Sequence, residues 1–296
     1  MTEILGQLFI GLINGSFYAL LSLGLAIIFG MLNIVNFAHG AIYMLGAFLG
    51  WIGLTQLSVW TGINGLKINY WLALLIVPVI VGFLGAGFER SLLRRLRKAD
   101  PVYGMLLTYG LALVLEGGFR HQYGVSGQPY EIPEAFRGAI NFGFMFLPKY
   151  RLSVVLVSLA VCAAAWYLIE RTRIGGYLRA GTENPVIAQS LGINVPMLVS
   201  LTYGVGVALA ALTGVLAAPI LQVSSQMGSE LNIIIFAVVV VGGMGSITGA
   251  IITGITLGLV QAVATLVYPE ASSIVIFILM SVVLFFRPAG LFGREA

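Results

Sequence analysis

The sequence predicts an all-α, polytopic membrane protein with about 8–10 transmembrane helices, organised as one transmembrane domain over residues 1–296. Hydrophobic residues make up 59% of the chain and charged residues only 9%, so there are too few polar groups to cover a soluble globule. Several apolar runs approach the roughly 20 residues that a helix needs to cross a bilayer. Because nearly every residue lies in or beside such a run, no soluble catalytic domain fits in the chain.

The apolar runs supply the expected helices in order. They lie at about residues 8–29, 41–57, 71–93, 102–119, 152–169, 197–221, 231–241, 247–267 and 274–286. The run at 231–241 has only about half the length of a span, so broken or re-entrant helices are expected. Glycine pairs at four-residue spacing predict close helix packing in lipid: Gly11 with Gly15, Gly46 with Gly50, Gly245 with Gly249, and Gly254 with Gly258.

Positive charge predicts the orientation of the chain. If the spans alternate, one side collects Arg90, Arg94, Arg95, Arg97, Lys98, Arg171, Arg173, Arg179, Arg287 and Arg294, and the other collects Lys67, Arg120, Arg137, Lys149 and Arg151. By the positive-inside rule the larger group is cytoplasmic. The C-terminus and the polar segment 171–196 are therefore expected in the cytoplasm, and the loop 120–151 outside.

Two polar, glycine-containing breaks interrupt the apolar runs, one in each half of the chain. They read NIVNFAHG at 33–40 and VGGMGSITG at 241–249. Paired breaks of this kind indicate an internal repeat and a substrate path in transporters, whereas turns at the membrane surface with tightly packed glycines would give the same pattern. The residues expected to line a path are Asn33, Asn36, His39, Gly40, Gly242, Gly243 and Gly245.

The polar segment 171–196 is predicted to contain a short helix ending near Gly192. Thr182 is a plausible N-cap and Asn184 an alternative, and Pro185 suits the first turn. Val186, Ile187 and Leu191 would then form a small apolar face that the helix cannot bury alone. Either the groove of a partner protein or the bilayer surface could cover this face.

Few ionisable residues fall within the expected spans. Glu116 is expected to pair with Arg120 at the helical i,i+4 spacing, and a gate or proton site is the alternative. His39 is expected to cap a helix or bond between helices, with a proton or ligand role as the alternative. No His, Cys, Asp or Glu cluster has metal-ligand spacing, so no metal is predicted.

Four motifs, in this order, resemble the LivH-type permease subunits of branched-chain amino acid ABC transporters, a family that includes uptake of hydrophobic amino acids and amides. They are NFAHGAIYMLGAF, RTRIGGYLRAGTENPVIAQSLGINV, VGGMGSITGAIITG and FRPAGLFG, and the likeness covers essentially the whole chain. The resemblance implies a multi-pass protein of the bacterial inner membrane that works by alternating access. It is expected to assemble with a second homologous permease, two cytoplasmic ATPases and a periplasmic or extracellular substrate-binding protein.

The resemblance also implies that a cytoplasmic element docks into an ATPase cleft. Carried over to this sequence, that element comprises Gly181, Thr182, Glu183, Asn184, Pro185, Val186, Ile187, Ala188, Leu191 and Gly192. ATP would be bound by the partner subunits, and the chain has no GxxxxGK[ST] phosphate loop of its own. It is therefore expected to be a permease component without a cofactor and not an enzyme. Urea, short amides or other small solutes are alternative substrates, and a passive channel is a more distant alternative.

Overall fold

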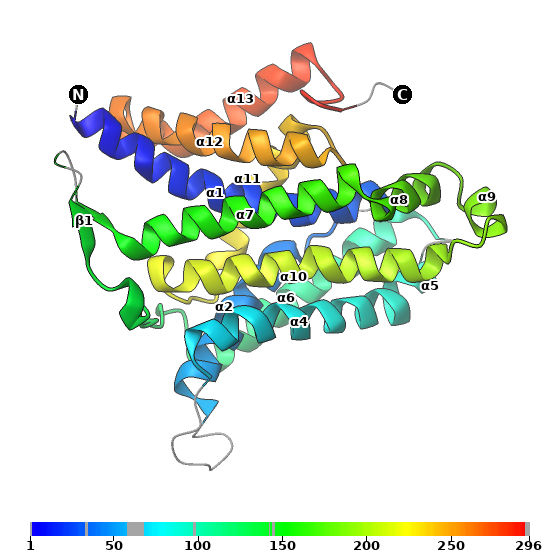
Figure 1. Cartoon of the computed structure of the whole chain (residues 1–296), viewed down its shortest axis with the longest axis horizontal. Coiled ribbons are helices and arrows are strands. Elements are labelled where there is room, and N and C mark those ends of the chain that lie inside the picture. Colours follow the sequence, from blue (N-terminus) through cyan, green and yellow to red (C-terminus); the bar gives the residue numbers. More distant parts are fainter. Residues whose placement is uncertain are drawn as a thin grey trace. The chain divides into compact units, whose positions relative to one another are not determined.

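The structure is a computed structural model that describes residues 2–32, 35–57, 68–96, 99–141, 143 and 146–293. Most of these residues are helical (Figure 1). The helices are α1 (Thr2–Leu32), α2 (His39–Thr55), α4 (Tyr70–Phe88), α5 (Arg94–Leu96), α6 (Pro101–Tyr123), α7 (Lys149–Arg171), α8 (Arg173–Glu183), α9 (Pro185–Ser190), α10 (Val195–Leu221), α11 (Met227–Gly242), α12 (Ile247–Val267) and α13 (Ser272–Phe286).

Three short helical turns and two short strands complete the described part of the chain. A π-helical turn, η1 (Glu89–Leu93), joins α4 to α5, and 3-10 turns occur at η2 (Glu134–Phe136) and η3 (Pro269–Ala271). The loop between α6 and α7 holds a small antiparallel hairpin, β1 (Ala139–Asn141) with β2 (Phe146–Pro148). The sequence predicted this loop as a non-spanning segment but did not predict the hairpin.

The predicted membrane-spanning architecture is confirmed. Within the described residues, six helical segments are long and apolar enough to cross a bilayer, and three shorter apolar helices accompany them. These elements coincide with the predicted runs. The short run at 231–241 becomes α11, which begins four residues earlier than expected, at Met227.

The described chain forms two compact units. Unit 1 comprises residues 1–31, 134–195 and 233–296, and unit 2 comprises residues 32–133 and 196–232. In unit 1, α1 runs against α12 (Figure 1). Glycines of both helices lie at this contact. A Cβ placed on Gly15 would lie 2.9 Å from the Cα of Ile255, so only glycine fits without a shift. The hydroxyl of Ser22 donates to the carbonyl oxygen of Ala250 at 3.3 Å along the same contact.

In unit 2, glycines likewise allow close packing of α10 against two neighbouring helices. A Cβ on Gly46 in α2 would lie 2.5 Å from the Cα of Ala211 in α10, and a Cβ on Gly204 in α10 would lie 2.8 Å from the carbonyl oxygen of Gly82 in α4. Backbones approach this closely only where side chains are absent, which is how membrane helices gain packing contacts. These contacts hold α2, α10 and α4 together as the frame of unit 2.

Candidate functional site

The polar segment 171–196 contains two helices, of which only the second was predicted. The first, α8, turns back from the end of α7, where Gly175 packs against the backbone of Ile169. Arg179 fixes this turn because its guanidinium donates to the carbonyl oxygen of Ile169 at 3.2 Å and lies 3.5 Å from the carboxylate of Glu170. The glycines in the segment obscured α8 in the sequence, because glycine disfavours helix interiors.

The second helix, α9, is capped at both ends. At its start, the side-chain oxygen of Asn184 accepts a hydrogen bond from the N–H of Ile187 at 3.1 Å, and Pro185 occupies the first turn. At its end, Gly192 adopts φ +86°, the N–H of Gly192 donates to Gln189 and the N–H of Ile193 donates to Ala188. This pattern is a Schellman motif, which satisfies the last carbonyl groups of a helix.

The predicted N-cap at Thr182 is wrong, and the alternative at Asn184 is confirmed. Helix α8 continues through Glu183, so Thr182 lies in its last turn and its hydroxyl donates to the carbonyl oxygen of Arg179 at 2.8 Å. The chain therefore passes from α8 to α9 with Asn184 as the sole residue between them. Because the connection is a single residue, the direction of α9 relative to α8 is closely restricted.

The apolar face predicted for α9 is exposed. The side chains of Val186, Ile187 and Leu191 are 74%, 57% and 76% exposed. Within the set assigned to ATPase docking, Gly181 and Ala188 are buried and face the interior of the chain, whereas Thr182, Glu183, Asn184, Pro185 and Gly192 are exposed. The segment thus presents a capped helix whose apolar side chains are left largely exposed by the part of the chain that the structure describes.

The first break, 33–40, lies in unit 2, and its described part is held by polar side chains. Asn33 lies outside the described residues. The oxygen of Asn36 accepts from the N–H of Ala38 at 3.1 Å, which forms a turn, and the N–H of Phe37 donates to the hydroxyl of Thr108 in α6 at 3.2 Å. Asn36 and His39 are buried, with 1% and 0% exposure, and His39 begins α2. Gly40 is also buried, because it packs against Gly228 in α11.

The second break, 241–249, lies in unit 1 and meets the chain's last described residues. The N–H groups of Leu291 and Phe292 donate to the carbonyl oxygens of Val241 and Gly242 at 2.8 and 3.2 Å. These bonds satisfy carbonyl groups that the end of α11 leaves open.

The glycines of this break pack against backbone within the same unit. A Cβ on Gly242 would lie 2.7 Å from the backbone of Gly249, and one on Gly243 would lie 2.8 Å from the Cα of Gly293. A Cβ on Gly245 would lie 3.2 Å from the Cα of Gly30. Close packing therefore accounts for these glycines in this conformation, and a role of Gly242, Gly243 and Gly245 in a substrate path stays a prediction.

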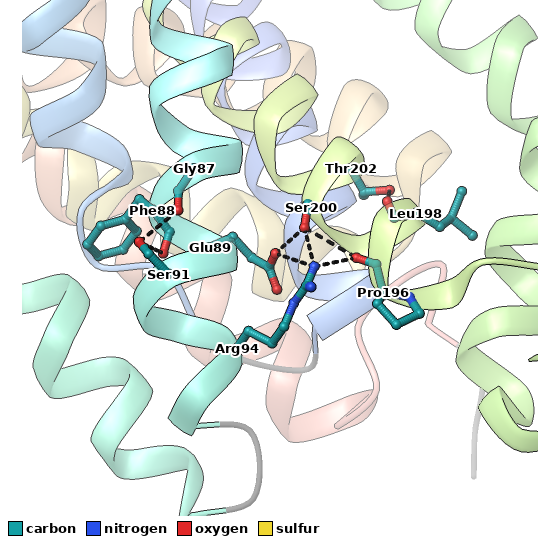
Figure 2. A network of polar contacts seen from close by, with 9 residues as sticks. All are labelled: Gly87, Phe88, Glu89, Ser91, Arg94, Pro196, Leu198, Ser200 and Thr202. Carbon is teal, nitrogen blue, oxygen red and sulfur yellow. Dashed lines mark hydrogen bonds and ion pairs between the residues drawn. The ribbon is translucent and has the colours of Figure 1, made fainter.

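One buried carboxylate escaped sequence reasoning. Glu89 begins the π-helical turn after α4 and is fully buried (Figure 2). Its carboxylate accepts a hydrogen bond from the hydroxyl of Ser200 in α10 and lies 3.5 Å from the guanidinium of Arg94. Arg94 in turn donates to the carbonyl oxygen of Pro196 at 2.7 Å. An acid inside a predicted span, five positions before an arginine, was the available signal.

A second ion pair lies within a single helix. Glu116 and Arg120 form the predicted i,i+4 ion pair at 2.8 Å on α6. Among the residues that the structure describes, no three His, Cys, Asp or Glu side chains gather as metal ligands.

Comparison with known proteins identifies the class. Residues 7–284 match the family model described as "Branched-chain amino acid transport system / permease component". The chain is 30% identical to the high-affinity branched-chain amino acid transport system permease protein BraD of Pseudomonas aeruginosa, over 98% of this chain and 96% of the relative. It is 29% identical to the LivH protein of the same description from Escherichia coli, again over 98% and 96%.

A more distant relative extends the match to an archaeon. The chain is 27% identical to the probable branched-chain amino acid transport permease protein LivH of Methanocaldococcus jannaschii, over 96% of this chain and 91% of the relative. No solved structure gives a significant match. The relatives are named as permease components and not as enzymes. With a family model that covers nearly the full length, this polytopic helical chain belongs to the permease components of branched-chain amino acid transport systems.

Proposed function

We propose that this chain is a permease subunit of an ATP-driven importer that carries branched-chain or related amino acids across the bacterial inner membrane by alternating access. Full-length similarity to relatives named as high-affinity branched-chain amino acid permeases supports the substrate class. The partners would be a second homologous permease, two cytoplasmic ATPases and a substrate-binding protein. The C-terminus and helices α8 and α9 would face the cytoplasm, as the distribution of positive charge predicts.

The geometry of α9 is the observation that carries this proposal. A six-residue helix is too short to be stable by itself in water, yet α9 is capped at both ends and exposes Val186, Ile187 and Leu191. Burial of a large aliphatic side chain contributes about 1.5–3 kcal/mol, so three such side chains give a partner's groove substantial binding energy. Helix-in-groove docking uses this arrangement, and the partner that the family context supplies is an ATPase.

Movement of α9 would drive transport without chemistry on the substrate. ATP binding would close the ATPase pair and displace α9, and hydrolysis would reset it. The substrate would pass the two breaks, with Asn33, Asn36, His39 and Gly40 in one and Gly242, Gly243 and Gly245 in the other. Burial of Asn36 and His39 is what we expect of a path that is closed in one of its two states.

Co-purification tests the docking step. The chain is co-expressed with the ATPase and permease subunits encoded in its gene neighbourhood, and the ATPase recovered per permease is measured. Val186→Ser together with Leu191→Ser removes most of the exposed apolar surface of α9, and we expect recovery of the ATPase to fall at least about tenfold, because anchor residues of this type dominate interfaces.

A matched control separates docking from general stickiness. Val125 is exposed to a similar degree, at 57%, and follows α6 in the predicted external loop, so Val125→Ser should leave recovery of the ATPase unchanged. Equal recovery of the ATPase with wild-type chain and with the α9 variant, at equal yield of folded permease, would remove α9 as the docking element.

A further inference from the structure

We propose that Glu89, Arg94 and Ser200, together with the carbonyl group of Pro196, form a joint that carries movement of α9 into α4. We call these four residues the Glu89 joint. The inference rests on the proposed function, because it assigns the route by which the docking helix acts on the spans. It goes further by naming positioning residues that neither the family match nor the sequence motifs point to.

The contacts of the joint are polar and lie at one end of two long helices. The carboxylate of Glu89 accepts from the hydroxyl of Ser200. One guanidinium nitrogen of Arg94 reaches three oxygens, at 2.6 Å in Ser200, 2.7 Å in Pro196 and 3.5 Å in Glu89. Figure 2 shows these side chains converging between the π-helical turn after α4 and the first turns of α10. The two helices are thus tied by a charge-assisted network.

The side chain of Glu89 is buried beside a partly exposed arginine. Its side chain is 0% exposed, whereas the side chain of Arg94 is 32% exposed. An acid within a membrane span is costly and is retained mainly where it serves function. A leucine would hold two apolar helices together as well, so a buried ionic network points to a contact whose direction and partners must be fixed.

The backbone at Glu89 is also unusual. Residues 89–93 form a π-helical turn, which occurs mostly as a single turn within α-helices and frequently at functional sites. The extra residue in this wider turn rotates the side chains of α5 about the helix axis relative to those of α4. Glu89 and Arg94, five positions apart, therefore share one face, and both reach Ser200.

The same two helices are locked by packing further along the span. A Cβ on Gly82 would lie 3.1 Å from the carbonyl oxygen of Gly204, and a Cβ on Gly204 would lie 2.8 Å from that of Gly82. The glycine contact and the Glu89 joint hold α4 to α10 at two levels. A displacement of the first turn of α10 must therefore move the cytoplasmic end of α4 with it.

The chain places this joint directly after the docking helix. Helix α9 ends at Ser190 and α10 begins at Val195. The connecting residues are not slack, because the N–H of Ile193 donates to Ala188 and the N–H of Val195 donates to Ile193. Pro196 follows immediately, and its carbonyl oxygen is the acceptor for Arg94. Force on α9 thus reaches the joint through a short, hydrogen-bonded connection.

Transport and ATP hydrolysis are measured separately to test this role. The complete transporter is reconstituted in proteoliposomes, and the substrate molecules imported per ATP hydrolysed are determined for wild type, Glu89→Gln and Ser200→Ala. Glu89→Gln keeps the shape and an acceptor for Ser200 but removes the attraction to Arg94. We expect the ATPases to stay bound and to hydrolyse ATP, while import per ATP falls about tenfold, the size of a typical coupling between sites.

The controls distinguish the possible failures. Glu116→Gln removes the acid of the i,i+4 ion pair on α6 and should leave import per ATP unchanged. If wild type itself binds no ATPase, the proposed function fails. If wild type is coupled and Glu89→Gln imports as much per ATP, the joint fails and the proposed function stands.

Misfolding is covered by the second variant. If Glu89→Gln is not recovered folded, Ser200→Ala, which keeps the ion pair, decides by the same ratio. Loss of bound ATPase in parallel with loss of import would assign the cluster a purely structural role and overturn the proposal.

Discussion

The side-chain amide of Asn232 in α11 bridges the first break: its nitrogen donates to the carbonyl oxygen of Phe37 at 3.1 Å, and its oxygen accepts from the N–H of Gly40 at 3.2 Å. One side chain thus satisfies both a backbone donor and a backbone acceptor of the break. Irregular backbone at membrane depth persists only where such partners exist.

Replacement of this bridge should destabilise the protein. Asn232→Ala removes both of these hydrogen bonds, and we expect a loss of about 1–3 kcal/mol of stability, seen as a lower midpoint of thermal unfolding in detergent. Asn232→Asp keeps the acceptor for Gly40 but not the donor to Phe37, so its midpoint should lie between. The control is Gln122→Ala, at an exposed position of α6; equal midpoints for all variants would contradict the assignment.

A single added methyl group between α1 and α12 should also lower the stability of the protein. A Cβ on Gly258 would lie 2.6 Å from the carbonyl oxygen of Gly11, so Gly258→Ala must push the helices apart and cost about 1–3 kcal/mol. At Gly117 in α6 nothing lies within 4 Å, so Gly117→Ala should be neutral or slightly stabilising. The thermal midpoints of the two variants, compared with wild type, test this, and a stable Gly258→Ala would refute the contact.

The cap at Asn184 should control how well α9 is formed. Asn184→Ala removes the acceptor for the N–H of Ile187, which costs about 1 kcal/mol of helix stability. If docking requires the formed helix, affinity for the ATPase should fall about fivefold. Asn184→Asp should restore it, because aspartate caps equally well. Binding is measured by titrating purified ATPase, and wild-type affinity for Asn184→Ala would separate the cap from docking.

Cysteine labelling tests the predicted path at the first break. In a Cys162→Ala background, cysteines at Asn36 and His39 should be protected from a small water-soluble thiol reagent in the conformation described here, since both positions are buried. They should become reactive in another state of the ATP cycle. A cysteine at Leu191, which is exposed, serves as the positive control. Protection in every state of the cycle would assign the break to packing alone.

Hydropathy sufficed to predict the spans, because the bilayer demands long apolar helices. The ends of α9 could also be predicted. Asn184, Pro185 and Gly192 act on the backbone beside them, so their effect can be read from the sequence alone. The N-cap was less certain, since Thr182 is also a capping residue, and only the continuation of α8 through Glu183 excludes it.

Contacts between distant segments could not be predicted in this way. Ser200 and Glu89 are 111 positions apart in the sequence, and neither segment contains a pattern that predicts contact with the other. The same holds for Leu291 and Val241, where the FRPAGLFG motif closes the second break. Two motifs that the sequence presented as separate signatures are one structural unit.

ATP-dependent uptake tests the central claim most directly. Proteoliposomes that contain the assembled transporter, with the binding protein and a radiolabelled branched-chain amino acid outside, are loaded with ATP or ADP, and the accumulated label is counted. We expect uptake with ATP, none above background with ADP, and loss of uptake when Val186→Ser and Leu191→Ser are combined. Uptake that is equal with ATP and ADP, or that survives the α9 variant at full rate, would contradict an ATP-coupled permease driven through α9.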